Sequence, residues 1–220
     1  MAKKIVMVLL ITAIVSGVAI AQDFQLGAGG GAFIDMSLLG NGWKKDKDNK
    51  ASSKATSFGG FVFFDATFAE LDITFGITKP GKTKVVVGGD KDTIDAPDKT
   101  SFTFFGFGLL GKYPLDLGAF TLSPMLGIHY NIFLSAKYDG DKVSRSDIKD
   151  FDADPPDQFS LLFGAGINFP FTDNVALKAD LLFRLGLPTK EAKDAVKDLD
   201  GTKATMGFGP QLRVGVIYTF

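Results

Sequence analysis

The C-terminal stretch Met206–Phe220, with the sequence MGFGPQLRVGVIYTF, alternates between oily and small or polar side chains. Its even-numbered positions are all apolar or aromatic, and its odd-numbered positions are small or polar apart from Ile217. A period of two residues predicts an extended strand, because successive side chains of a strand point to opposite faces. One face of this strand is therefore apolar, and either a protein core or lipid has to cover it.

The same alternation recurs along the chain and predicts eight strands in all. These are residues 24–38, 57–68, 71–78, 101–113, 120–137, 158–169, 175–187 and 206–220. The fourth strand is the least regular, because Phe102 and Phe104 fall on one parity and Phe105 and Phe107 on the other. A β-bulge near Phe104 would reconcile them. Residues 82–87 are expected to carry the third strand beyond the membrane.

The connections favour lipid over a protein core, because they are alternately long and short. Residues 40–56, 79–99, 138–157 and 188–205 form long polar loops, whereas residues 69–70, 114–119 and 170–174 form short turns. Antiparallel strands that cross a bilayer have tight turns on one side and long loops on the other. A soluble sandwich has no reason to sort its loops in this way.

Ionisable residues in mid-strand point to the same conclusion, because they occupy the face opposite the apolar one. The predicted interior polar set is Asp35, Asp65, Asp72, His129, Lys178, Asp180, Arg184 and Arg213. A soluble eight-stranded barrel has its apolar face inward and its charges outward, whereas a membrane barrel reverses the two. A Lys or Arg facing lipid near the midplane costs about 2–4 kcal/mol, and the regular strands place none there. The sequence thus predicts an all-β fold: an eight-stranded antiparallel transmembrane up-and-down β-barrel over residues 22–220.

The N-terminus reads as a secretory signal peptide over residues 1–21. Lys3 and Lys4 precede an apolar run at residues 5–18, and Ala19-Ile20-Ala21 fits the small-x-small cleavage pattern. The 24 basic and 25 acidic residues nearly balance, which argues against a nucleic-acid partner. The chain has no cysteine, so disulfides and thiolate metal sites are excluded.

The signal peptide, eight strands, sorted loops and terminal GVIYTF together resemble the small outer-membrane β-barrels of the OmpA/OmpX type, with a weaker OmpW-like resemblance. The resemblance implies the outer membrane of a diderm bacterium, passage through periplasmic chaperones and insertion by the barrel-assembly machinery. It also implies a C-terminal assembly signal, formed here by Leu212, Val214, Val216, Tyr218 and Phe220. We expect a monomer surrounded by outer-membrane lipid, with host or environmental ligands at the long loops.

The packing of the barrel interior distinguishes a structural or surface-exposed barrel from a channel. An eight-stranded barrel is only wide enough for its own side chains to fill, and inward-facing Phe33, Phe61, Phe63, Leu162 and Leu182 take up further space. This favours a structural or surface-exposed, non-enzymatic barrel with paired internal charges. The alternative is a narrow channel or transporter for small hydrophobic solutes, which those apolar residues would line.

Specific chemistry receives little support from the sequence. His129 is the only histidine, and Ser123 and Ser135 on the same strand are about 20 Å from it, too far to serve as a nucleophile. A lipid-modifying enzyme is therefore a distant alternative. The aspartates of the loops at residues 79–99 and 138–157 lack the spaced pattern of a calcium loop. The GAGGGAF segment lacks the Lys-Ser/Thr of a phosphate loop. We expect no cofactor and no metal.

Overall fold

The computed structural model describes residues 25–40, 49–87, 90–94, 99–150, 157–187 and 206–220. Its elements in chain order are β1 (Leu26–Gly40), β2 (Asn49–Ala66), β3 (Ala69–Val87), β4 (Asp90–Ile94), β5 (Ser101–Lys112), β6 (Leu115–Asp116), β7 (Thr121–Tyr138), β8 (Asp141–Ser144), α2 (Arg145–Asp150), β9 (Gln158–Pro170), β10 (Val175–Gly186) and β11 (Met206–Thr219). Within these ranges no helix has the length and apolar character needed to cross a bilayer. The expected signal peptide and the expected loop at residues 188–205 lie outside the described residues.

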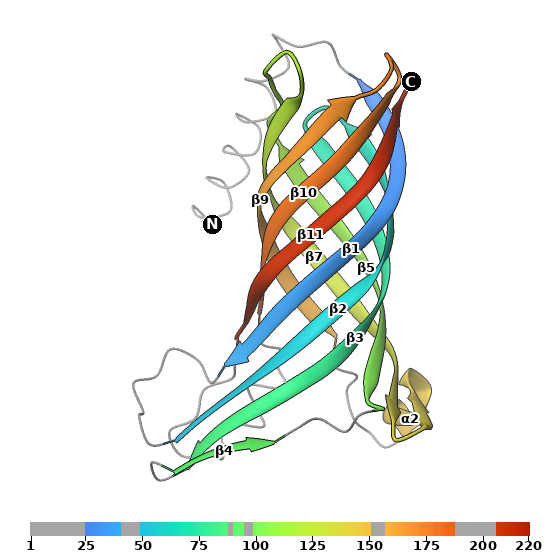
Figure 1. The fold of residues 1–220 in the computed structure, drawn as a ribbon. Coiled ribbons are helices and arrows are strands. Elements are labelled where there is room, and N and C mark those ends of the chain that lie inside the picture. The colour runs from blue at the N-terminus through green and yellow to red at the C-terminus, as the bar shows by residue number, and fades with distance from the viewer. Residues whose placement is uncertain (1–24, 41–48, 88–89, 95–98, 151–156, 188–205) are drawn as a thin grey trace, which may run out of the picture.

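The long strands close into a barrel (Figure 1). Around the wall the order is β1, β2, β3, β5, β7, β9, β10 and β11, after which β11 pairs with β1. In the closing pair Ala28 lies opposite Tyr218 and Ile34 opposite Leu212. Closure gives every wall strand two hydrogen-bonded neighbours, as a sheet in hydrocarbon requires. The predicted eight-stranded antiparallel barrel is confirmed.

The two ends of the barrel differ in their connections. Short turns join β2 to β3, β5 to β7 and β9 to β10, and they lie at the end that carries the C-terminus, uppermost in Figure 1. The opposite end carries β4 and α2, on connections that run from β3 and β7. We call these the short-turn end and the long-connection end. The alternation of turn lengths expected from the sequence thus corresponds to two distinct ends.

The hairpin of β2 and β3 is longer than the sequence pattern indicated. β2 begins at Asn49 rather than at residue 57, and β3 continues to Val87, where β4 pairs with its end. The expected continuation of the third strand is therefore confirmed. The start of β2 cannot be recognised from the sequence, because NKASSKAT contains no large apolar side chain and so shows no clear apolar alternation.

The irregularity expected in the fourth predicted strand lies on its neighbour instead. Thr103 pairs with Ser135 and Phe104 with Phe133, which leaves Leu134 of β7 as the extra residue. β5 itself pairs with β3 without interruption. The predicted bulge within this strand is therefore wrong, and Phe104 is simply a buried residue that points into the barrel.

The outer surface of the wall is apolar at alternate positions. Exposed side chains on it include Leu26, Ile34, Met36, Phe58, Val62, Phe64, Leu71, Ile73, Phe75, Phe107, Leu109, Leu126, Ile128, Phe159, Leu161, Phe163, Leu181, Phe208, Leu212, Val214 and Val216. Soluble proteins rarely expose so extended an apolar surface. A closed sheet with apolar residues outside and charges inside is typical of outer-membrane β-barrels. The chain is an integral outer-membrane β-barrel.

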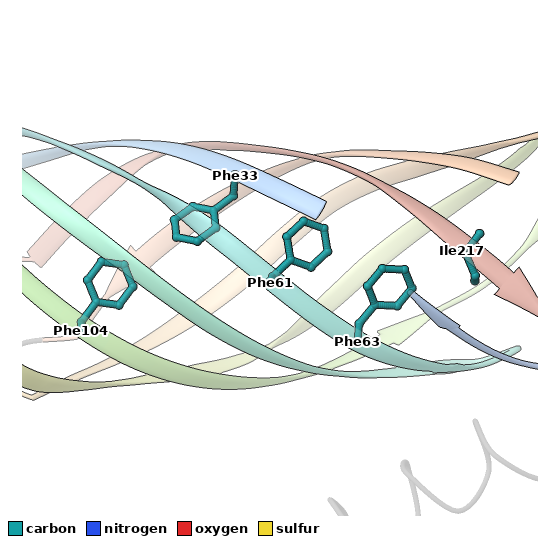
Figure 2. Packing of buried hydrophobic residues seen from close by; sticks show 5 residues of the cluster. All are labelled: Phe33, Phe61, Phe63, Phe104 and Ile217. Carbon is teal, nitrogen blue, oxygen red and sulfur yellow. The ribbon is translucent and has the colours of Figure 1, made fainter. Parts of the chain in front are cut away.

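Bulky apolar side chains occupy part of the interior. One buried cluster comes from β1, β2, β5 and β11 and comprises Phe33, Phe61, Phe63, Phe104 and Ile217 (Figure 2). A second comes from β5, β7, β9 and β10 and comprises Leu110, Met125, Leu162 and Leu182. The inward-facing apolar residues expected from the sequence are thus packed against one another rather than lining open space.

Candidate functional site

The barrel interior holds a set of buried ionisable side chains and is the candidate functional site. Each of the eight side chains assigned to it from the sequence is at most 6% exposed: Asp35, Asp65, Asp72, His129, Lys178, Asp180, Arg184 and Arg213. They sit at alternate strand positions, opposite the apolar outer face, because successive side chains of a strand alternate between faces. The period of two in the sequence is therefore sufficient to place them.

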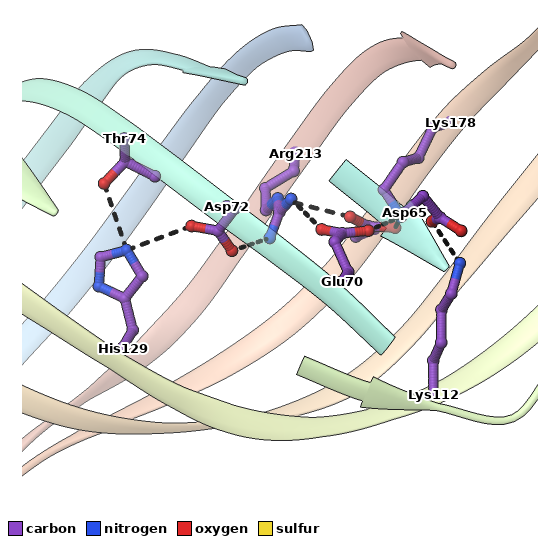
Figure 3. A network of polar contacts seen from close by, with 9 residues as sticks. Asp65, Glu70, Asp72, Thr74, Lys112, His129, Lys178 and Arg213 are labelled. Carbon is purple, nitrogen blue, oxygen red and sulfur yellow. Dashed lines mark hydrogen bonds and ion pairs between the residues drawn. The ribbon is translucent and has the colours of Figure 1, made fainter. Parts of the chain in front are cut away.

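Arg213 of β11 is the centre of the network (Figure 3). Its Nη2 lies 2.5 Å from Glu70 Oε1, its Nη1 lies 3.2 Å from Asp72 Oδ2, and its Nε lies 3.4 Å from Asp180 Oδ2. A guanidinium presents five N–H donors in a planar fork, so it can serve several carboxylates at once. One cation thereby connects β11 with β3 and β10.

Lys178 completes the centre from the next strand. Its Nζ lies 2.9 Å from Glu70 Oε2 and 2.9 Å from Asp180 Oδ1. Since β10 and β3 are separated by three strands in either direction around the wall, the contact between Lys178 and Glu70 joins opposite sides of the barrel. Side chains therefore bridge the whole cross-section at this level.

Further ion pairs lie around this centre. Arg184 Nε is 3.1 Å from Asp35 Oδ2, and Lys112 of β5 pairs with Asp65 of β2. Each joins two strands that have one strand between them. Breaking such a buried pair by removing one partner typically costs about 3–5 kcal/mol, because an uncompensated charge remains.

Aromatic rings and glycines pack tightly around the charges. The guanidinium carbon of Arg213 lies 4.3 Å from the ring centroid of Phe61, and Lys178 Nζ lies 5.5 Å from that of Phe63. On β5, a Cβ added to Gly108 would come within 2.8 Å of a carboxylate oxygen of Asp72. Interior side chains thus reach the backbone of a neighbouring wall strand, which is the packing expected of a filled barrel.

His129 has neighbours that superficially suggest catalysis. Its Nε2 lies 3.2 Å from Thr74 Oγ1 and 3.6 Å from Asp72 Oδ1. In a nucleophilic triad the hydroxyl and the carboxylate contact opposite ring nitrogens, so that one orients the ring while the other exchanges a proton. Here the same nitrogen faces both groups, and all three side chains are buried. This arrangement fits a structural histidine better than a catalytic one.

Two members of the network were not assigned from the sequence. Glu70 is fully buried and contacts both central cations, although the sequence pattern predicts a turn at residues 69–70. The turn actually precedes it, and β3 begins at Ala69. The usable signal was parity, because Glu70 shares the inward parity of Asp72. Lys112 shares the inward parity of Phe104 and Leu110 on β5, but the mixed parity of the phenylalanines in this strand leaves its register undecided from the sequence.

The short-turn end of the barrel contains an open polar vestibule of about 390 Å³. Its lining includes Asp116, Asn168, Asp173 and the pair of Asp65 and Lys112. The side chains of that pair are only 8% and 5% exposed. Both side chains of the pair are thus largely shielded from solvent although they border the vestibule.

At the long-connection end, Asp157 fastens α2 to the barrel wall. Its carboxylate accepts hydrogen bonds from Arg145 at 2.5 and 2.8 Å, from the Phe133 amide at 2.9 Å and from the Tyr130 hydroxyl at 3.0 Å. We call this set the Asp157 clasp. Burial raises the pKa of the Asp157 carboxyl, but the hydrogen bonds, that of Arg145 foremost, outweigh it and hold the pKa below the ordinary aspartate value. The same contact raises the pKa of Arg145.

The remaining residues singled out in the sequence lie on the surface. The expected assembly-signal residues Leu212, Val214, Val216, Tyr218 and Phe220 are all exposed. Of the loop aspartates, Asp95, Asp152 and Asp154 lie outside the described residues. In the part of the chain that the structure describes, no group of His, Asp and Glu residues is arranged to hold a metal ion.

No protein-family model and no curated protein sequence matches the chain. Among solved structures, the chain is similar to Neisserial surface protein A, with 16% identity, a TM-score of 0.47, and coverage of 90% of this chain and 97% of that one. It is also similar to the outer-membrane protein OprG of Pseudomonas aeruginosa, with 15% identity, a TM-score of 0.44, and coverage of 89% and 95%. The outer-membrane protease OmpT of Escherichia coli has 10% identity, a TM-score of 0.44, and coverage of 91% and 99%. Likenesses at this level carry no argument about what the chain does.

Proposed function

We propose that this chain is a non-enzymatic outer-membrane barrel whose interior is closed by its own side chains and whose long-connection end makes contacts at the cell surface. The observation that carries the proposal is the salt bridge from Lys178 to Glu70, which spans opposite walls, together with Arg213 beside it. A barrel crossed in this way is a rigid support rather than a conduit.

The contacts of the interior argue against the channel alternative. A solute route along the axis would require Lys178 and Arg213 to leave Glu70, so that buried charges would lose their partners. The apolar side chains that were candidates to line such a route are themselves packed into clusters. A lipid-modifying enzyme is disfavoured by the burial and one-sided contacts of His129.

The long-connection end supports a surface role because its elements are firmly attached. The hairpin of β2 and β3 extends into this end and is continued by β4. α2 is fastened by the Asp157 clasp. Outer-membrane barrels have short periplasmic turns and longer extracellular loops, so this end is the one expected to face outward.

Planar-bilayer recording tests the closed interior. The refolded barrel should show no stable steps of nanosiemens conductance. Such steps in the wild-type protein would refute the closed interior and favour the channel.

Cysteine labelling on intact cells tests the orientation, since the natural chain contains no cysteine. Lys142→Cys, on β8 at the long-connection end, should react with a membrane-impermeant maleimide. Asp173→Cys, in the short turn between β9 and β10, is the matched control and should react only after the outer membrane is permeabilised. The opposite labelling pattern would show that the proposed surface is periplasmic.

A further inference from the structure

The outward-facing side chains of β2 and β3 change from apolar to basic toward the long-connection end. Nearer the short turns, outward positions such as Val62, Phe64, Ile73 and Phe75 are exposed and apolar. Beyond Phe58, the exposed outward positions include four lysines. We call this group the lysine rim; it consists of Lys54, Lys79, Lys82 and Lys84.

A bulge brings these lysines to one face. Along β3 the even-numbered positions point inward as far as Thr78, so an unbroken strand would turn Lys82 and Lys84 toward the barrel axis. Ser53 pairs with Thr83 whereas Ala55 pairs with Pro80, so that β3 contains one extra residue here. The extra residue reverses the parity and puts both lysines on the outer face with Lys54 and Lys79.

Opposite charges on the neighbouring strand lie on the other face. On β4, Asp92 pairs with Val85 and Asp90 with Val87, at positions that alternate with Lys84. Directly paired residues of antiparallel strands share a face. The residue of β4 that pairs directly with Lys84 is Thr93. Acidic and basic groups of this hairpin are therefore separated between its two faces.

The lysine rim begins where the apolar surface ends. Phe58 pairs with Ile77, and the next outward pair is Thr56 with Lys79. The ammonium of Lys79 lies 5.7 Å from the ring centroid of Phe58. Lysines at the edge of a lipid-facing apolar surface extend their ammonium groups toward the headgroup layer.

We propose that the lysine rim binds the phosphate groups of anionic lipid in the leaflet at the long-connection end. Charge complementarity supports binding of anionic lipid, because the lysine ammonium groups are positive and the phosphate of the headgroup is negative. Continuity with the lipid-facing wall supports it further, because a lipid already packed on Phe58 and Val62 has its headgroup at the level of Lys79. Each lysine close to an anionic surface is attracted to it, so several on one face produce a preference among lipids.

Spin-label electron paramagnetic resonance measures this preference directly. The barrel is reconstituted in phosphatidylcholine bilayers that contain a trace of spin-labelled phosphatidic acid or spin-labelled phosphatidylcholine. The wild type should prefer phosphatidic acid by roughly 3–10-fold, within the attraction expected for lysines at an anionic surface. The variant K54Q/K79Q/K82Q/K84Q should show a ratio near one. The matched control K137Q/K142Q removes two exposed lysines from β7 and β8 and should keep the wild-type ratio.

Two further arms keep the result decisive. Replacing the four lysines of the rim by arginine preserves the charge and should preserve the preference, so that a general effect of mutation on folding is distinguished from loss of binding. Inorganic phosphate added at constant ionic strength should leave the preference unchanged. A wild-type ratio of one, a quadruple glutamine variant that keeps the preference, or abolition by inorganic phosphate would each overturn lipid binding at the rim.

Discussion

Replacing Arg213 by methionine should destabilise the folded barrel by about 3–5 kcal/mol, as expected for loss of one partner from a buried charge network. Arg213 contacts Glu70, Asp72 and Asp180 at 2.5–3.4 Å. At an effective dielectric constant of 20, each pair of charges about 4 Å apart attracts by about 4 kcal/mol. Desolvation of the guanidinium costs several kcal/mol and offsets most of this gain. The remainder is lost in the variant, and the carboxylates that stay behind repel one another.

Urea unfolding in lipid vesicles, followed by the mobility shift between folded and unfolded barrel on gels, measures this loss. Adding Glu70→Gln to Arg213→Met should restore about 1–3 kcal/mol, because residues of one charge network are coupled. Gln211→Met is the matched control on the same face of β11 and should cost less than about 1.5 kcal/mol, the ordinary range for a neutral hydrogen bond. The reasoning fails if Arg213→Met costs less than about 1 kcal/mol, well below the buried-pair range, or if Glu70→Gln deepens the loss.

Other measurements test other parts of the structure. Leu181→Arg, on the lipid face, should cost about 2–4 kcal/mol in vesicle refolding; a neutral result would place this side chain away from lipid. Gly108→Ala, whose added Cβ meets a carboxylate oxygen at 2.8 Å, should lower the free energy of unfolding by about 1–3 kcal/mol, unlike Gly111→Ala, where the nearest atom is 3.5 Å away. The pKa of Asp157 is lowered in the folded protein, so the clasp is stable above the ordinary aspartate pKa of about 4 and loosens as pH falls through the lower folded value. Amide protection in α2 should therefore drop at low pH, and a pH-independent protection factor would contradict this. Deleting Phe220 should slow membrane insertion without affecting export; unchanged insertion would count against the proposed assembly signal.

The wall of the barrel could be predicted from the sequence because a single rule governs it. Residues such as Leu181 and Lys178 are assigned to lipid or interior by parity alone, and a closed barrel leaves each strand only these two faces. The rule fails where the outer face stops being apolar. The start of β2 at Asn49 shows no apolar alternation. Its pairing with the end of β3 therefore cannot be predicted from the sequence.

The partners within the interior could not be predicted from the sequence. Arg213 and Glu70 are 143 residues apart, and their contact depends on how far neighbouring strands are displaced along the wall. The alternation of side chains predicts that both residues point inward, but it does not predict their positions along the barrel axis. Glu70 was missed for a simpler reason, because its strand begins two residues earlier than the apolar pattern of 71–78 indicates.

The chain order of the central contact also has a consequence for biosynthesis. Glu70 and Asp72 belong to an early strand, whereas the guanidinium that neutralises them arrives with the final one. A polypeptide truncated before Arg213 would leave Asp72 without its guanidinium partner and Glu70 with Lys178 alone. Full charge compensation of these carboxylates is therefore possible only once the last strand has joined the wall.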